Sequence, residues 1–246
     1  MNVDRKPAAL VGMLFIIAAV TSIVGLVLYQ PLLSDPDYLM KGAENANQII
    51  LGVMFELGLV VSAIGTTVML FPYLRKYNES LALGYLCFRF LEAIVITIGI
   101  VSVLALLSLS REFVSTSNPN LSVFHATGKM LIATHDWTFI LGPNFMLGVN
   151  TLMYSALFYK SKLIPRLISI LGLTGATLIF VAAVLELFGI IAQVSVWGAV
   201  LALPVFAYEM TLAVWLIAKG FNSSAILSTP VITDAPHAAL KQGVAS

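Results

Sequence analysis

The sequence predicts an all-α membrane protein, a bundle of six transmembrane helices with both the N- and C-termini in the cytoplasm. Three observations support this prediction: the chain is 59% hydrophobic and only 10% charged, it contains six long apolar stretches, and its basic residues gather on one side of them. A soluble domain carries about a quarter charged residues. A chain with this composition, and with a mean hydropathy of +0.98, needs a bilayer as its solvent.

The six apolar stretches determine the predicted number of spans. A helix needs about 20 apolar residues to cross the hydrocarbon core of a bilayer, and each stretch reaches that length. The stretches cover residues 8–29, 49–74, 80–107, 137–159, 164–190 and 194–218.

The first stretch follows Arg5 and Lys6, as the apolar part of a signal peptide would. Its apolar run is longer than the roughly 7–15 residues typical of signal peptides, and the sequence YQPLLSD after it has no small-residue cleavage site. We therefore expect a retained first span. The loop that follows, residues 30–48, is acidic and contains Pro31 and Pro36.

The later stretches contain recognisable breaks and contacts. Residues 108–136 begin with the turn-rich SREFVSTSNPN and continue as LSVFHATGKMLIATHD, which we expect to form a helix lying at the outer interface. The fourth stretch contains Gly142 and Pro143, and because proline lacks a backbone N–H the helix should kink or break there. In the fifth stretch, Gly172 and Ala176 have the spacing typical of close helix contacts.

Basic residues predict the orientation, because cytoplasmic loops carry an excess of lysine and arginine. Nine of the 13 basic residues fall on the side that holds both termini, three fall on the other side, and Arg89 lies inside a span. Both termini should therefore be cytoplasmic. The nine are Arg5, Lys6, Arg75, Lys76, Lys160, Lys162, Arg166, Lys219 and Lys241, and the three are Lys41, Arg111 and Lys129.

We predict one transmembrane domain, residues 1–220, and a disordered cytoplasmic tail, residues 221–246, which is rich in Ser, Ala, Thr and Pro. The protein should be a multi-pass protein of the cell inner (plasma) membrane, with the lipid bilayer as its partner. The net charge of +1 and the lack of a basic run argue against nucleic acid. The sequence is compatible with a homo-oligomer and does not decide the oligomeric state.

Sequence motifs for several kinds of chemistry are missing. The three histidines, His125, His135 and His237, fall outside the predicted spans, which argues against bis-histidine haem. There is no phosphate-binding loop and no Gly-x-Ser-x-Gly motif. We therefore expect no cofactor. Cys87 is the single cysteine, so it forms no intramolecular disulfide, and we expect it to be a packing residue.

Three charged residues fall near the middle of the predicted spans. A charge at the bilayer centre costs about 2.5–3.5 kcal/mol on insertion scales, so such residues face the bundle interior and find partners. Arg89 and Glu92 are three residues apart and share a helix face. Glu209 lies ten residues before Lys219, about 15 Å along a helix, which places it at a similar depth. We expect Arg89 to be held by both Glu92 and Glu209, in a network that is either structural or functional.

A second group of polar residues is expected near the outer face. A metal would need three or four such ligands, but the spacing matches no metal motif, so interfacial solvation is the preferred interpretation and no metal is predicted. Asn144 and Asn150, in the interrupted fourth stretch, are expected to line a cavity. The four residues of the outer group are Glu56, His135, Asp136 and Glu186.

Three segments resemble a known family: YLRKYNESLALGYLCFRFLEA, HDWTFILGPNFMLGVNTLMYSALFYKSKLIPRLISILGL and EMTLAVWLIAKGF. They resemble the bacterial integral membrane family called domain of unknown function 4386, over about residues 8–221. This resemblance implies the six-span fold but no activity. Phe90 departs mildly from the small aliphatic residue usual after the arginine. The signature positions that the resemblance implies are Arg89, Glu92, His135, Asp136, Pro165, Arg166 and Glu209.

Three classes of function remain open. The first, which we favour, is a protein that binds or transports a small solute or lipid at Arg89, Glu92 and Glu209. The second is an intramembrane enzyme in which the outer His, Asp and Glu residues hold a metal or act as acid and base. The third is a structural or sensory membrane protein without a substrate, in which the charges only hold the bundle together.

Overall fold

The computed structural model describes residues 5–193 and 195–222, and all regular secondary structure in these residues is helical. From residue 223 onward, the predicted tail lies outside the described residues. In chain order the elements are α1 (Arg5–Leu28), α2 (Gln30–Leu33), α3 (Tyr38–Glu44), α4 (Ala46–Leu74), α5 (Glu79–Ser115), α6 (Leu121–Phe139), the π-helix η1 (Ile140–Met146), α7 (Leu147–Ser161), α8 (Arg166–Leu187) and α9 (Val196–Ala218).

Five helices in the described part of the chain are long and apolar enough to cross a membrane, namely α1, α4, α5, α8 and α9. The fourth predicted span falls on the remaining long rod, in which α6, η1 and α7 follow one another without a loop. The prediction of an interruption at Gly142 and Pro143 is confirmed, because both residues lie in the π-helical turn. Proline removes one backbone donor, and a wider π turn accommodates that loss.

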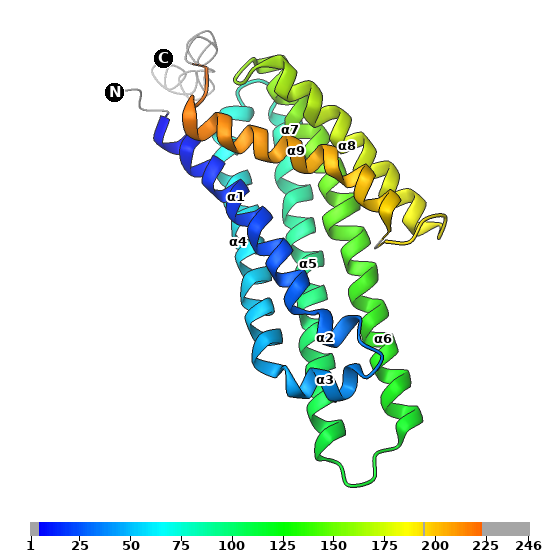
Figure 1. The fold of residues 1–246 in the computed structure, drawn as a ribbon. Coiled ribbons are helices and arrows are strands. Elements are labelled where there is room, and N and C mark those ends of the chain that lie inside the picture. The colour runs from blue at the N-terminus through cyan, green and yellow to red at the C-terminus, as the bar shows by residue number, and fades with distance from the viewer. Residues whose placement is uncertain (1–4, 194, 223–246) are drawn as a thin grey trace, which may run out of the picture.

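The helix expected within residues 108–136 is present as α6, but it does not form a separate helix lying across the end of the bundle. Instead, α5 continues to Ser115, and α6 begins at Leu121, where the side chain of Asn120 accepts a hydrogen bond from the backbone N–H of Val123. Because α6 runs on into η1 and α7, this segment extends the fourth rod and does not turn away from it. At 37 residues, or about 55 Å, α5 is longer than a hydrocarbon core of about 30 Å. The α5–α6 hairpin therefore projects from one end of the bundle (Figure 1).

Helices α1 and α9 form one side of the bundle, and α5 runs behind them (Figure 1). The two helices cross near the end of the bundle where α1 begins and α9 ends, and they diverge toward the other end. Gly12 makes this crossing close, since a Cβ atom there would lie only 2.6 Å from the carbonyl oxygen of Ala213. The crossing of α8 with α9 is equally close, because a Cβ on Gly175 would lie 2.7 Å from the backbone nitrogen of Val205.

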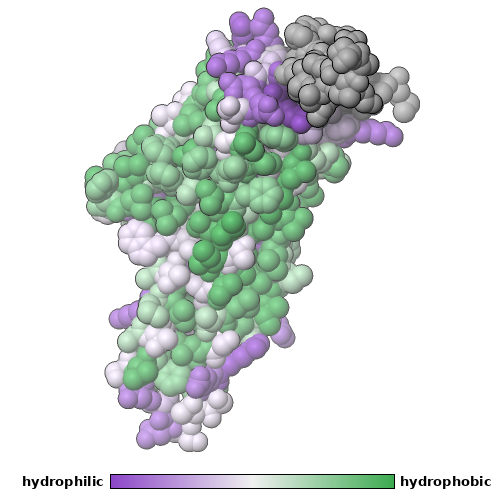
Figure 2. All heavy atoms as spheres, turned by 180° about the vertical axis from the view of Figure 1, so that it is seen from behind, coloured by the Kyte–Doolittle hydropathy of each residue, from purple (hydrophilic) through white to green (hydrophobic). Residues whose placement is uncertain are grey.

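A hydrophobic band covers the middle of the molecule, and hydrophilic residues gather at its two ends (Figure 2). Large apolar side chains such as Val61 and Leu203 are more than half exposed within the membrane-length helices. This distribution is the one expected of a surface that faces lipid. Cys87, which we expected to be a packing residue, is also exposed on this surface.

Most of the buried apolar residues fall into two large clusters, one toward each end of the bundle, and a small third cluster of Ile179, Ala182 and Val205 joins α8 to α9. Phe15 of α1 belongs to one cluster, and Tyr29, which directly follows α1, belongs to the other. The first cluster also includes Phe221, whose ring lies 4.7 Å from that of Tyr73. Residue 221, which we expected to begin the tail, is therefore packed against the bundle.

Candidate functional site

A cavity of about 270 Å³ lies between the two apolar clusters. Its lining residues on α1 fall between Phe15 of that helix and Tyr29 just beyond its end, which belong to opposite clusters. Every membrane-length helix and the π turn contribute to it. The lining residues are Ala18, Ala19, Ser22, Ile23 and Leu26 from α1, Glu56 and Leu59 from α4, Arg89, Glu92 and Ile96 from α5, Phe139, Pro143, Asn144 and Leu147 from the fourth rod, Ile179 from α8, and Ala202, Val205, Phe206 and Glu209 from α9.

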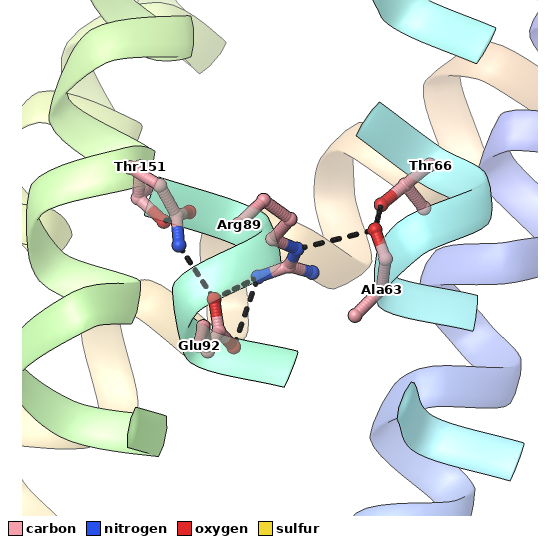
Figure 3. Close-up of polar contacts among 6 residues, drawn as sticks. Ala63, Thr66, Arg89, Glu92 and Thr151 are labelled. Atoms are coloured by element: carbon pink, nitrogen blue, oxygen red, sulfur yellow. Dashed lines mark hydrogen bonds and ion pairs between the residues drawn. The ribbon is translucent and has the colours of Figure 1, made fainter. Parts of the chain in front are cut away.

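Arg89 and Glu92 form an ion pair on the α5 wall of this cavity (Figure 3). The Arg89 Nη1 donates to both carboxylate oxygens of Glu92, at 2.9 and 3.2 Å, and its Nε donates to the carbonyl oxygen of Ala63 at 3.4 Å. The side-chain amide of Asn150 also donates to Glu92. Both charged residues are only 3% exposed. A buried pair of this kind is stable only when further hydrogen bonds satisfy it, as Ala63 and Asn150 do here.

Glu209 lines the same cavity from α9, but the expected contact between Glu209 and Arg89 is not formed. Among the described residues, Glu209 has no hydrogen bond or ion pair, and its Oε1 is buried without a partner. The physical reason is the direction of the guanidinium, whose Nη1 and Nε are turned toward Glu92 and Ala63. The cavity therefore contains one satisfied ion pair and one unpartnered carboxyl group.

Glu56, which we expected near the outer face, lines this central cavity as well. Its Oε2 accepts a hydrogen bond of 3.1 Å from the hydroxyl of Tyr29. Glu56 also borders a second, smaller cavity together with His135, Thr138 and Pro143. The central and smaller cavities are therefore neighbours that share one carboxyl group.

Three of the four residues of the expected outer group are neighbours, because His135 borders the smaller cavity with Glu56 and its Nδ1 lies 3.7 Å from Oδ1 of Asp136. His135 is buried, with its ring edge-on to that of Tyr29 at 6.1 Å, while the adjacent Asp136 has a side chain that is 53% exposed. Glu186 accepts a hydrogen bond of 2.7 Å from Asn144. Within residues 5–193 and 195–222, no three His, Cys, Asp or Glu side chains come together in a way that could hold a metal ion. The expected outer group is therefore formed in part: Glu56, His135 and Asp136 are neighbours, whereas α8 carries Glu186 to Asn144.

The two asparagines of the fourth rod have different positions. Asn144 lies in the π turn and lines the central cavity, whereas Asn150 lies outside the lining and supports Glu92 from behind. Sequence reasoning missed the small residues Ala18, Ala19 and Ser22, which leave space on the α1 side. Their only signal is a run of small side chains within an otherwise bulky span.

The cavity is open on the side where α1 and α9 diverge. Among its lining residues, Ile23 and Leu26 of α1 and Phe206 of α9 are the large apolar side chains with 39–53% exposure. These rim residues are apolar and belong to membrane-length helices. The rim of the cavity therefore belongs to the apolar outer surface of the bundle.

The fold and this cavity define a multi-span helical membrane protein with a charged site inside its bundle. The chain belongs to the family described as domain of unknown function (DUF4386), whose family model matches residues 10–220. This match confirms the family resemblance. No curated protein and no solved structure matches the chain.

Proposed function

We propose that this protein binds a small amphipathic molecule, a solute or a lipid, in the central cavity and carries it across the membrane. The observation that carries the proposal is the cavity itself: about 270 Å³ of space with apolar walls, a buried ion pair and an unpartnered carboxyl group. Sites for drug-sized ligands occupy about 300–1,000 Å³, so the ligand, or the part of it that is enclosed, is small.

The position of the cavity supports transport over binding alone. Arg89 and Glu209 each lie about ten residues, or about 15 Å, from the helix end on the side of the termini, which is close to the bilayer midplane. Membrane transporters bind their substrates at this depth, next to helices whose regular hydrogen bonding is interrupted. The π turn Ile140–Met146 supplies such an interruption beside the cavity.

The proposal includes a topology of six spans with both termini cytoplasmic. The rod formed by α6, η1 and α7 supplies the sixth span, in addition to the five helices of membrane length. The excess of basic residues on the side of the termini favours this orientation.

The test is to identify what the cavity holds. The protein is purified in lipid nanodiscs, and its bound small molecules are released and measured by mass spectrometry. Filling the cavity with Ala19→Phe should lower ligand occupancy about tenfold or more, since one overlapping ring removes the space that the ligand needs. The matched control is Val20→Phe, because Val20 lies on the same helix but points to lipid and is 51% exposed. Equal occupancy in wild type, Ala19→Phe and Val20→Phe would contradict the proposal.

A further inference from the structure

The carboxyl groups that line the cavity outnumber its cationic groups. Three glutamates, Glu56, Glu92 and Glu209, face a single guanidinium, that of Arg89. Arg89 is already matched by Glu92 at 2.9 Å, and Glu56 accepts the hydroxyl of Tyr29. Glu209 is the carboxyl group left without a partner.

No side chain that α1 or α8 brings to the cavity lining balances a charge on Glu209, and the cation that acts on it from α5, Arg89, is already paired with Glu92. The helices packed against α9 are α1 and α8, and they bring only apolar, small or hydroxyl side chains to the cavity lining, such as Ser22 and Ile179. The titratable or charged groups around Glu209 are the Arg89–Glu92 pair and the carboxyl of Glu56 in the cavity, and the phenols of Tyr154 and Tyr208 beside it.

An unpaired carboxylate in apolar surroundings is costly, so an empty cavity favours the protonated, neutral form of Glu209. A cation that binds beside Glu209 removes this cost, because it supplies the missing opposite charge. The same group can therefore hold either a proton or a ligand cation. The two forms leave the total charge of the cavity unchanged.

We propose that the cavity binds a lipophilic monovalent cation, an ammonium group on an apolar body, and releases one proton from Glu209 as it does so. This inference rests on the proposed function of the same cavity. In the binding step the O–H bond of the Glu209 carboxyl breaks, its proton leaves to water, and the ligand ammonium forms an ion pair with the carboxylate. No other bond forms or breaks. Carried across the membrane, this step is an exchange of one cation for one proton.

The walls of the cavity select an apolar body over a bare metal ion. Apolar side chains dominate the lining, and Phe139 and Phe206 place two aromatic rings beside the polar floor. Aromatic faces attract ammonium groups, which adds to the ion pair. A hard metal cation would need about six or more oxygen ligands around one point, or retained water. Among the described residues, no three His, Cys, Asp or Glu side chains come together in a way that could hold one. The apolar rim at Ile23 and Phe206 also faces the phase in which a lipophilic cation concentrates.

The test compares three probes of similar shape on the protein in nanodiscs: benzyltrimethylammonium, its uncharged analogue neopentylbenzene, and the anion benzylsulfonate. Binding is measured by titration calorimetry in two buffers of different ionisation enthalpy, which counts the protons released. We expect the cation to bind at least about tenfold more tightly than either other probe, since only the cation gains a charge partner. It should release about one proton, with about a tenfold gain in affinity per pH unit over the range in which Glu209 is protonated.

Glu209→Gln should abolish proton release and remove the preference for the cation, whereas Glu209→Asp should keep proton release. Glu79→Gln is the matched control, because Glu79 begins α5 outside the cavity and should change neither result. Cation binding to wild type without proton release, or an equally tight neutral probe, would overturn this inference. These outcomes differ from a failure of the proposed function, in which none of the probes binds or Ala19→Phe has no effect on any of them.

Discussion

Arg89 and Glu92 form an ion pair one helical turn apart on α5, with 2.9 Å between Nη1 and Oε2, and each is only 3% exposed. The pair is joined to two other helices, because Arg89 donates to Ala63 of α4 and Glu92 accepts from Asn150 of α7. A charged pair placed at this point holds three helices in register. It also forms one wall of the central cavity, so its structural and functional roles can be separated only by mutation.

Arg89→Met should destabilise the protein strongly, by about 3–5 kcal/mol, because it leaves the buried carboxylate of Glu92 without its counter-ion. The measurement is the free energy of unfolding in mixed micelles, followed by circular dichroism as denaturing detergent is added. The double variant Arg89→Met/Glu92→Leu should recover much of the loss, because no isolated charge remains. A double variant as unstable as Arg89→Met alone would contradict this explanation.

The Arg89–Glu92 pair could be predicted from the sequence because the relationship is local. Two residues three apart in a helix share a face whatever the rest of the fold does. The common depth of Arg89 and Glu209 follows in the same way, from counting residues to the helix end. The membrane-length helices α1, α4, α5, α8 and α9 likewise follow from the length of each apolar run.

The hydrogen bond of Glu56 to Tyr29 and the unpaired state of Glu209 could not be predicted, because they depend on how helices tilt and rotate. Glu56 lies ten residues into α4, which begins at Ala46, and the tilt of α1 brings Tyr29 to it. The direction of the Arg89 guanidinium decides whether Glu209 is paired. That direction depends on the side-chain rotamer of Arg89, which the sequence alone does not determine. The cavity could not be predicted either, since its space depends on small residues such as Ala19. An alanine in an apolar span gives no sequence signal of a binding site.

Gly12→Ala should weaken the crossing of α1 with α9 and destabilise the protein by about 1–3 kcal/mol, the usual cost of overpacking a tight contact. A Cβ at this position would lie 2.6 Å from a backbone oxygen of Ala213, which cannot rotate away. Gly58→Ala on α4 is the control, because its Cβ would meet its nearest neighbour, on Thr21, at an ordinary 3.4 Å. Thermal unfolding of both variants tests the contrast. The control should be unchanged or gain up to about 1 kcal/mol from helix propensity.

The proposed topology predicts that single cysteines will be labelled from opposite sides of the membrane. In a Cys87→Ser background, Ser117→Cys in the α5–α6 turn should react with a membrane-impermeant maleimide added outside intact cells. Lys162→Cys in the α7–α8 turn should react only after the cells are opened. Both positions are exposed, so access depends on the side and not on burial. Labelling of Lys162→Cys from outside would reverse the orientation.

Glu209→Leu should leave the stability of the empty protein unchanged or raise it, in contrast to Arg89→Met. Among the described residues, Glu209 has no partner that would lose a hydrogen bond or an ion pair when the carboxyl group is removed. Removing a buried polar group that makes no hydrogen bond avoids a desolvation cost of about 1–3 kcal/mol. The measurement is again the free energy of unfolding, for Glu209→Leu and for the isosteric Glu209→Gln. If Glu209 instead paired with Arg89, both variants would lose stability, and Glu209→Leu combined with Arg89→Met would lose less than the sum of the two single losses. A stable Glu209→Leu protein that no longer retains ligand would show that this carboxyl group contributes to ligand binding and not to the stability of the fold.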